Sequence, residues 1–587
     1  MKGFRRTLTG RYDAIRRTLL SMHPDVVSFD IYDTLITRPF VKPTDLFTYM
    51  EEHLGMKGFR DARIKAESES RRLSDREDIT IDDIYDIIPS EYRGLKKTEI
   101  QYERELVVPM RPAVDLLKEM KADGRQIVLV SDMYLPETVI EDCLKRCGIP
   151  YDRLFVSSTY GKTKHIGSLF DIVLEETGVK PDRIVHIGDN RHADVKMPKT
   201  RGIASIHVRK PIDVYLSEDP RKSRYLSRRG SCGSSMIAAL DMIHLMNGSD
   251  GLSEWYETGF RFGGPLAYAY SLFIGSNLRG GSLPVFVSRD GYNLMKVTEI
   301  LFPKMRKGVY VHAQRVLSQA LSDHGIRMGE IHPPSSLTYH FLYRKDIEDA
   351  RHILRFLSDI FPDVPRDDDE MIGFYNDNIE RIDLERKRRR TEYEDYLRGM
   401  VGEADIDLID CTTMKYTSQR FVEGILGRKV HGIYLVSLAD DGSMDHSSFH
   451  TKSSIAMGWM GINIDEFLLC SPEYPIAGWN GGPCFISAPE CEVERVSNYG
   501  DITSGECDYA RMMNGIFGEY RPAFDYLDVM EWTLASVDDD VCGGLMRRIK
   551  WASDPDHKVW NGIVPDARSI PTIIRKQLTD IIFRMNG

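Results

Sequence analysis

Residues 26–40, VVSFDIYDTLITRPF, constrain the fold of this chain more than any other stretch. Val26, Val27 and Phe29 are β-branched or aromatic and lack helical spacing, which predicts a short buried strand. Asp30 then stands at the carboxyl end of that strand, the edge at which open parallel sheets bind ligands. An isolated aspartate after a strand is usually a turn or capping residue. A functional interpretation of Asp30 therefore depends on the rest of the chain.

Residues 125–208 alternate predicted strands with predicted helices. The candidate strands are RQIVLVS, RLFVSS, RIVHIG and ASIHV, and segments between them, such as ETVIEDCLKRCG and GSLFDIVLEETG, have helical periodicity. Such alternation is typical of a parallel sheet with helices on both faces. Residues 43–123 show apolar residues at helical spacing and no candidate strand. The sequence thus predicts an α/β fold, a Rossmann-like doubly wound parallel sheet with an inserted helical segment.

Polar side chains that suit phosphoryl transfer stand at the carboxyl ends of these strands. In chain order they are Asp30, Ser131, Lys164, Asp189 and Asp194. A phosphoryl group in transfer carries negative charge on its oxygens, which a lysine, hydroxyl groups and Mg²⁺ stabilise. Mg²⁺ takes one or two carboxylates plus water and substrate oxygens, so Asp30 with Asp189 or Asp194 would bind it. Asp30 is then the expected nucleophile, and water would hydrolyse its aspartyl-phosphate.

Residues 26 to about 210 resemble the haloacid dehalogenase (HAD) superfamily. The matching residues are Asp30-Ile31-Tyr32-Asp33-Thr34 for the first motif, Ser131 for the second, Lys164 or, less well, Lys162 for the third, and Gly188, Asp189 and Asp194 for the fourth. The resemblance implies catalytic roles for Asp30, Ser131 and Lys164. It also implies Mg²⁺ bound by the Tyr32 carbonyl and by the carboxylates of Asp30, Asp189 and Asp194. The helical segment, at about residues 40–112, corresponds to a cap domain that closes over the site in relatives.

One position departs from the pattern of the phosphatases in this superfamily. They carry a second aspartate two residues after the nucleophile, which protonates the leaving group and then activates water; here that residue is Tyr32. Positioned acid–base catalysis contributes roughly 10² to 10⁴ in rate. We therefore expect slow turnover or another proton donor, with Asp33 the nearest candidate. Dehalogenases of the superfamily also have tyrosine here and need no metal, but the acidic pair Asp189 and Asp194 favours a cation site and phosphoryl chemistry.

The second half of the chain has no motif of comparable strength. Segments typical of buried strands followed by polar turns and helices are LPVFVSRDGYNLM, GVYVHAQRVL, IDLIDCTTMKYTSQRF and VHGIYLVSL. They predict a second α/β domain. We place the HAD-like catalytic domain at residues 1–225 and the second domain at residues 226–587. The SRDGY turn from Ser288 resembles the SDMY turn from Ser131, which duplication and coincidence explain about equally well.

The pairing of an FDIYDTL segment with a later SRDGY segment resembles large bacterial proteins of the superfamily that accompany surface-polysaccharide synthesis. That resemblance implies a phosphorylated sugar or glycan intermediate as substrate and glycosyltransferases of the same pathway as partners. The competing hypothesis is a catalytically weak protein that keeps the fold for binding or assembly. Tyr32 favours this hypothesis, whereas the complete set of polar strand ends favours an enzyme.

The composition of the chain limits the partners and cellular locations that remain to be considered. The net charge of −11 and the pI of about 5.9 argue against nucleic acid as a partner. The basic run from Arg386 to Arg390 is expected to be the solvated face of a long helix. The nine cysteines include no CxxC pair, and no run of about 18 apolar residues occurs. We therefore expect a cytoplasmic protein without a transmembrane segment.

Overall fold

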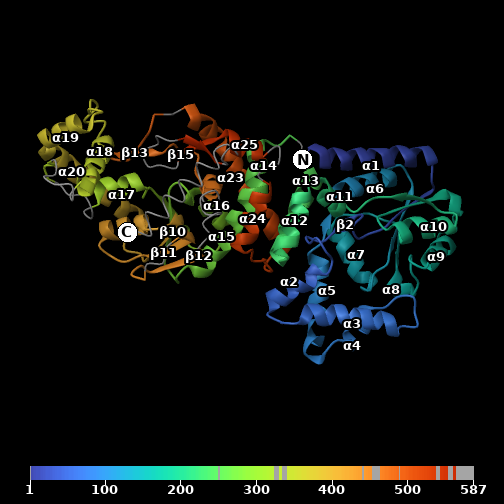
Figure 1. The fold of residues 1–587 in the computed structure, drawn as a ribbon. Helices are drawn as coiled ribbons and strands as arrows, with labels where there is room; N and C mark the ends of the chain where they lie inside the picture. The colour runs from blue at the N-terminus through green and yellow to red at the C-terminus, as the bar shows by residue number, and fades with distance from the viewer. Residues whose placement is uncertain are drawn as a thin grey trace. The chain divides into compact units, whose positions relative to one another are not determined.

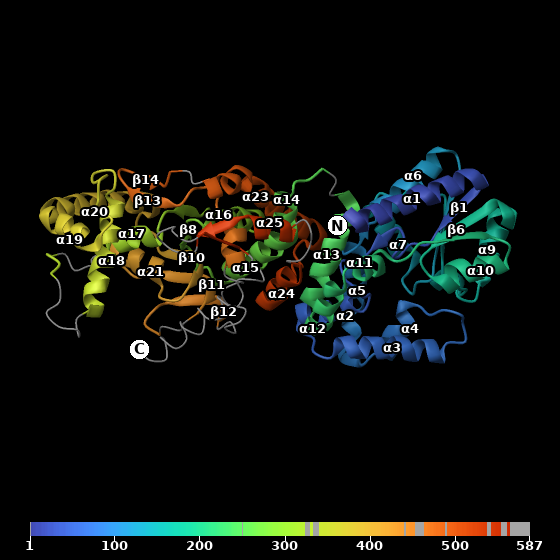
Figure 2. The same cartoon turned by 45° about the horizontal axis from the view of Figure 1, so that its top comes forward.

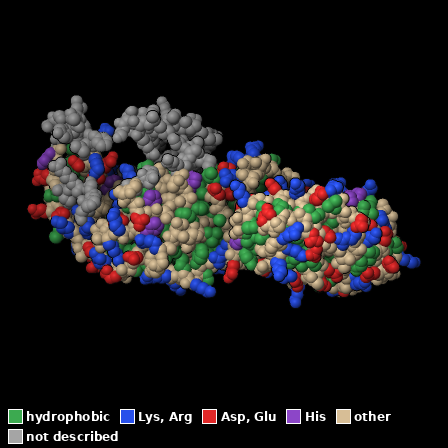
Figure 3. Space-filling view, turned by 90° about the horizontal axis from the view of Figure 1, so that it is seen from below, with side chains coloured by type: hydrophobic (Ala, Val, Ile, Leu, Met, Phe, Trp, Pro, Cys, Tyr) green, Lys and Arg blue, Asp and Glu red, His purple; other side chains and the backbone are tan. Residues whose placement is uncertain are grey.

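The chain forms two compact units. The computed structural model describes residues 2–248, 251–322, 329–332, 340–438, 442–451, 463–487, 490–536, 542–552 and 560–563. Unit 1 comprises Met1–Leu252 and Met512–Ser536, and unit 2 comprises Ser253–Arg511 and Val537–Gly587 (Figure 1). None of the helices in the described ranges is both long and apolar enough to cross a membrane. On the face drawn in Figure 3, Lys and Arg side chains are interspersed with Asp and Glu side chains.

The division between the units differs from the predicted boundary at residue 225. The chain continues in unit 1 through α12 (Pro220–Arg229) and α13 (Cys232–Gly248), and both helices pack against α24 (Tyr526–Ser536). Hydrogen bonds fix this packing, because the Tyr225 hydroxyl donates to the Asp528 carbonyl at 2.8 Å and Arg229 Nε to the Asp528 carboxylate at 2.6 Å. A segment distant in sequence therefore completes unit 1.

Unit 1 is built on a five-stranded parallel sheet in the order β5-β4-β1-β6-β7. The strands are β1 (Val26–Phe29), β4 (Gln126–Ser131), β5 (Arg153–Val156), β6 (Ile184–Gly188) and β7 (Ala204–His207). β1 lies in the middle and pairs with β4 and β6, and all its side chains are buried, as its apolar run predicts. The strand order reverses between β1 and β6, which makes their carboxyl ends the expected ligand-binding edge.

The segment predicted as a helical insertion, at about residues 40–112, contains helices in the structure. It contains α2 (Asp45–Leu54), α3 (Phe59–Leu73), α4 (Ile81–Ile87), the 3₁₀ helix η1 (Ser90–Leu95) and α5 (Lys96–Glu105). The chain enters and leaves it through the antiparallel pair β2 (Ile36–Thr37) and β3 (Val108–Pro109). Local signals set its helix ends: Thr80 and Asp83 form a capping box at the start of α4, and Gly55, at φ +65°, ends α2.

A buried ion pair joins two helices of this insertion. Arg63 of α3 donates from Nε and Nη2 to the Glu99 carboxylate of α5 at 2.8 and 2.7 Å, and both side chains are fully buried. The Tyr85 hydroxyl also donates to Glu99, at 2.8 Å. Such a pair fixes the relative position of α3 and α5, because separating the charges in this dry environment is costly.

Unit 2 contains a second five-stranded parallel sheet, in the order β12-β11-β10-β8-β9 (Figure 2). Its strands are β8 (Leu283–Val287), β9 (Val309–Val311), β10 (Ile406–Thr413), β11 (His431–Ser437) and β12 (His446–Thr451). The predicted second α/β domain is thus confirmed. The SRDGY turn follows the first strand of this sheet, whereas the SDMY turn follows the second strand of the unit 1 sheet. The two turns therefore hold different places in their sheets.

The basic run in α20 (Ile379–Val401) is not simply a solvated face. Arg386 and Arg389 are buried, and Arg389 binds the Asp359 carboxylate with Nη2 at 2.7 Å while Arg386 Nε donates to the Ala320 carbonyl at 2.6 Å. Arg388, which is 43% exposed, matches the prediction. The prediction was wrong for Arg386 and Arg389. Because these residues are three apart, they share a helix face, and this face packs against carbonyl groups of the core.

We predict that Glu99→Gln lowers the free energy of unfolding of unit 1 by about 3 kcal/mol, because it leaves a buried guanidinium without its full counter-charge. Urea denaturation of the full chain measures this loss. Glu69→Gln is the matched control, since its partner Arg72 is 66% exposed and surface pairs contribute little. Equal unfolding curves for the two variants would contradict the structural role of the buried pair.

Candidate active site

Asp30 occupies the end of the central strand of unit 1. Its backbone N–H donates to the Ile187 carbonyl at 2.8 Å, which extends the ladder between β1 and β6 by one residue. The side chain is only 8% exposed. One carboxylate oxygen accepts a hydrogen bond from the Thr34 hydroxyl at 3.1 Å, and the other contacts the Lys164 ammonium group. The first motif therefore holds its own aspartate through the threonine four residues later.

Lys164 joins two of the predicted site carboxylates. Its Nζ contacts Asp30 Oδ1 and lies 2.7 Å from Asp194 Oδ1. The loop around it is fixed by Asp132, whose carboxylate accepts the backbone N–H groups of Lys164 at 2.7 Å and His165 at 3.1 Å. This positioning role of Asp132 was not predicted from the sequence, although Asp132 directly follows the predicted site residue Ser131.

Asp194 is held in place from several directions. Its Oδ2 accepts the Asn190 backbone N–H at 2.8 Å, and its Oδ1 lies 3.2 Å from His186 Nε2. His186 Nδ1 in turn lies 2.8 Å from the Ser28 hydroxyl of β1. Gly188 is required here, because a Cβ at that position would lie 2.4 Å from the Asp194 carboxyl carbon. The sequence signal that could have identified His186 is a histidine inside the buried strand RIVHIG.

The site concentrates negative charge in a dry environment. Burial raises the pKa of Asp30 well above its usual value, with Lys164 opposing and the neighbouring aspartates adding to the effect. Burial likewise raises the pKa of Asp189. Burial would also raise the pKa of Asp194, but Lys164 and His186 outweigh it and hold that pKa below the usual range. The three carboxylates are therefore electrostatically coupled.

These three carboxylates could hold a metal ion. Among the residues that the structure describes, Asp30, Asp189 and Asp194 each offer an oxygen, and these oxygens lie within 4.8 Å of one another. A set of carboxylate oxygens suits a hard cation such as Mg²⁺. A bound cation would also relieve the mutual repulsion that raises the pKa of Asp30 and Asp189. The donor set thus fits the predicted cofactor.

Two of the remaining predicted residues point to other partners. The guanidinium carbon of Arg38 lies over the Tyr32 ring, 4.4 Å from the ring centroid. Arg38 also binds the Glu103 carboxylate through two hydrogen bonds of 2.8 Å. Asp33, at φ +60°, accepts a hydrogen bond from Lys210 Nζ at 2.9 Å. The same ammonium group lies 3.5 Å from Asp189 Oδ2. Lys210 therefore links Asp33 to the carboxylate group.

The two weaker motif assignments also have defined positions. Ser131 ends β4, beside β1, and its side chain is buried. Lys162, the alternative to Lys164, instead binds the Glu77 carboxylate of the insertion at 2.9 Å. Glu77 also accepts hydrogen bonds from the Thr163 backbone N–H, at 3.1 Å, and from the Ser168 hydroxyl. The insertion thus contacts the same loop that carries Lys164.

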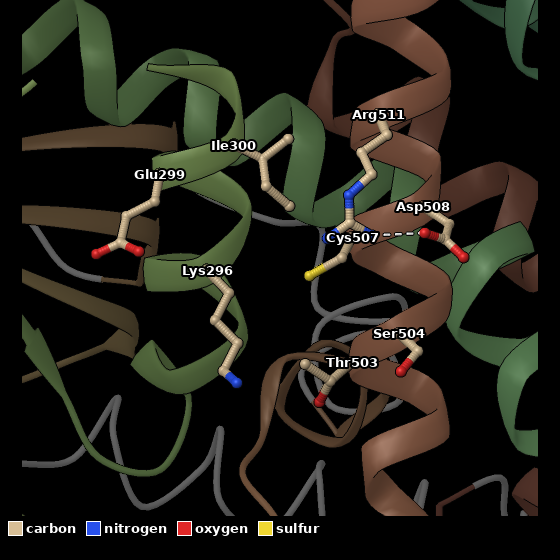
Figure 4. Close-up of a pocket in the computed structure, with 8 residues that line it drawn as sticks. All are labelled: Lys296, Glu299, Ile300, Thr503, Ser504, Cys507, Asp508 and Arg511. Atoms are coloured by element: carbon tan, nitrogen blue, oxygen red, sulfur yellow. Dashed lines mark hydrogen bonds and ion pairs between the residues drawn. The ribbon is translucent and has the colours of Figure 1, made fainter. Parts of the chain in front are cut away.

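Unit 2 contains a separate pocket of about 530 Å³ between α16 (Gly291–Leu301) and α23 (Glu490–Phe517) (Figure 4). Its lining residues are Lys296, Glu299, Ile300, Thr503, Ser504, Cys507, Asp508 and Arg511. Arg511 and Asp508 form an ion pair at 2.5 Å, so part of the charge in the pocket is neutralised locally. No residue of the predicted site lines this pocket.

Comparisons with known proteins identify the segment around Asp30. Residues 24–200 match the model of a hydrolase family described as haloacid dehalogenase-like hydrolase, which confirms the HAD-like fold of this segment. A search of curated proteins found no match. The L-2-haloacid dehalogenase from Xanthobacter autotrophicus with chloropropionic acid covalently bound is 17% identical, over 37% of this chain and 88% of that one, with a TM-score of 0.27. The magnesium complex of a HAD family enzyme from Bacteroides thetaiotaomicron is 14% identical, over 32% of this chain and 94% of that one, with a TM-score of 0.25.

We predict that millimolar Mg²⁺ raises the melting temperature of the protein and that Asp189→Asn reduces this shift. A ligand that binds only the folded state stabilises it by mass action, by about 2.7 kcal/mol at a hundredfold excess over its Kd. Differential scanning fluorimetry across a Mg²⁺ titration measures the effect. The matched control is Asp182→Asn, on the exposed turn before β6. Identical titrations of wild type and Asp189→Asn would exclude the site.

Proposed function

We propose that unit 1 is a Mg²⁺-dependent phosphohydrolase or phosphotransferase that acts through an aspartyl-phosphate on Asp30. The observation that carries this proposal is the position of the Lys164 ammonium group, in contact with Asp30 and 2.7 Å from Asp194, at a strand edge that also holds Asp189. An ammonium group and a cation site beside a carboxylate suit a reaction in which phosphoryl oxygens carry the charge.

Each residue of the site has its own role in the proposed reaction. The Asp30 carboxylate attacks phosphorus, so that a carboxyl O–P bond forms and the bond from phosphorus to the leaving oxygen breaks. Lys164 and the Ser131 hydroxyl would bind the phosphoryl oxygens in this reaction. Asp30, Asp189 and Asp194 would hold Mg²⁺, which would supply positive charge to the site. Water then hydrolyses the acyl phosphate, or a second hydroxyl group accepts the phosphoryl group.

The place of the usual acid–base residue is taken by Tyr32. Burial, together with Glu103, raises its pKa well above the usual value, so the phenol keeps its proton at neutral pH. Arg38 pairs with Glu103 and lies over the Tyr32 ring. This arrangement supports a site that handles good leaving groups well and alkoxide leaving groups poorly.

We extend the proposal to the substrate class and pathway. The substrate would be a phosphorylated sugar or another phosphorylated glycan intermediate of bacterial surface-polysaccharide synthesis in the cytoplasm, and the partners would include glycosyltransferases of that pathway. This part rests on the sequence resemblance of the FDIYDTL and SRDGY segments. The acidic composition of the chain supports the absence of a nucleic acid partner.

We predict that the wild type hydrolyses para-nitrophenyl phosphate and acyl phosphates in Mg²⁺ and that Asp30→Asn abolishes this activity. The amide cannot form the acyl phosphate, whereas these substrates need no proton on the leaving group. Phosphate release measures the rate, and mass spectrometry after rapid quenching detects phosphate on Asp30. The matched control is Asp25→Asn, at the exposed start of β1, where the side chain pairs with Arg183. If the wild type binds Mg²⁺ normally but hydrolyses none of these substrates, the hydrolase proposal is wrong and the binding or assembly hypothesis remains.

We predict that Tyr32→Asp raises turnover of sugar phosphates by about 10²-fold, because it restores a carboxylate that can protonate an alkoxide leaving group. Tyr32→Phe is the matched control and should leave turnover unchanged. A loss of activity in Tyr32→Phe would show instead that the phenol itself is the proton donor. Turnover of 2-haloacids without metal, together with inactivity on every phosphate, would favour dehalogenation.

A further inference from the structure

The SRDGY turn of unit 2 places a serine beside a histidine. The parallel pairing of β8 with β9 sets Val287 opposite Val311, and the Ser288 backbone N–H donates to the Val311 carbonyl at 2.8 Å. Both valines are buried in the core. Because side chains alternate along strands, the next residues, Ser288 and His312, turn together to the opposite side. Their side chains meet, with Ser288 Oγ 3.2 Å from His312 Nδ1.

A hydrogen bond holds the backbone at His312 in place. The hydroxyl group of Tyr393, a fully buried residue of α20, donates to the His312 carbonyl at 2.7 Å. The ring is half-buried, and burial lowers its pKa, which favours the neutral imidazole that can accept a proton. It lies beside Phe485, whose side chain is 42% exposed, with 6.2 Å between the ring centroids. The histidine thus approaches the surface of unit 2.

The third residue of this group is Glu473, a carboxylate. Glu473 accepts hydrogen bonds from the Tyr310 hydroxyl at 2.8 Å and from the Ser471 hydroxyl at 3.3 Å. The Tyr310 ring is next to the His312 ring, with 5.6 Å between centroids. Glu473 also acts electrostatically on His312, raising its pKa against the effect of burial. A carboxylate that acts electrostatically on a histidine in this way favours the imidazolium that forms when the histidine takes a proton.

Helix α16 begins shortly after Ser288 in the chain. Gly291 opens α16 only three residues after Ser288, and a Cβ at Gly291 would lie 2.8 Å from Phe286 Cβ. The glycine therefore allows the helix to begin close against β8. The Asp290 side chain makes no capping hydrogen bond to this helix, so the N–H groups of its first turn are not capped by that residue. N–H groups at a helix N-terminus are donors of the kind that stabilise an oxyanion.

We propose that Ser288 and His312, supported by Glu473, form a second catalytic centre, an acyl-transfer site that hydrolyses carboxylic esters. A serine that stands between a strand of a parallel sheet and a helix, and that contacts a histidine, is in a setting that activates serine nucleophiles. Ser288 Oγ attacks the ester carbonyl carbon and its proton passes to His312. The bond from the carbonyl carbon to the leaving oxygen then breaks, and His312 protonates the released alcohol. Water, deprotonated by His312, hydrolyses the acyl-serine to a carboxylic acid.

Two measurements on the full chain test this centre. A fluorophosphonate probe should add its phosphonyl group to Ser288, with loss of fluoride, and peptide mass spectrometry locates the adduct. Hydrolysis of para-nitrophenyl acetate gives the rate. Ser288→Ala should abolish the adduct and lower kcat/KM by about 10³-fold, and His312→Gln should lower both the labelling rate and kcat by about 10²-fold or more. Glu473→Gln should lower kcat with KM unchanged, as expected of a positioning residue.

The control variant is Ser504→Ala, an exposed serine of unit 2 that is distant in sequence from this centre. It should label and hydrolyse as the wild type does. Circular dichroism and thermal unfolding check that each variant folds, and if Ser288→Ala does not fold, wild-type labelling and His312→Gln decide the outcome. The absence of an adduct on wild-type Ser288, or equal labelling of wild type and His312→Gln, would overturn the proposal.

Discussion

The geometry of unit 1 depends on one shared cation, the Lys164 ammonium group between Asp30 and Asp194. Burying two carboxylates so close together is unfavourable unless positive charge lies between them. The sheet supplies the carboxylates from neighbouring strands, and Asp132 fixes the loop that brings the lysine to them. The insertion reaches the same loop through Glu77. Packing, loop conformation and charge balance are thus satisfied by a single set of contacts.

Much of this site could be predicted from local patterns. Val26, Val27 and Phe29 identify a buried strand, and Asp30 follows it at the edge where the structure places the carboxylate group. The spacing from Gly188 to Asp194 was part of the resemblance, and the structure supplies its reason, since a side chain at Gly188 would collide with the Asp194 carboxyl group. These features are set within a few residues, so periodicity and motif order reveal them.

The features that were missed depend on contacts between distant segments. His186 lies between Ser28 and Asp194, and only the assembled sheet brings Ser28 and His186 together. The inward turn of Arg389 depends on Asp359, 30 residues away, which no helical pattern shows. The pairing of Ser288 with His312 requires the register of β8 and β9. Sequence periodicity predicts which face of a helix or strand is buried. Which residue contacts that face is known only from the tertiary structure.

The return of residues 512–536 to unit 1 affects how the chain is made. At a synthesis rate of about 5 to 20 residues per second, roughly 15 to 60 seconds separate the emergence of Leu252 from that of Ser536. During this interval α12 and α13 lack the helix that covers them, and the ring of Tyr225 lacks Trp532, its partner at 5.4 Å. Unit 1 therefore begins to leave the ribosome before unit 2 but is completed only after most of unit 2 has emerged. Its uncovered helices are a surface that a chaperone could shield during translation.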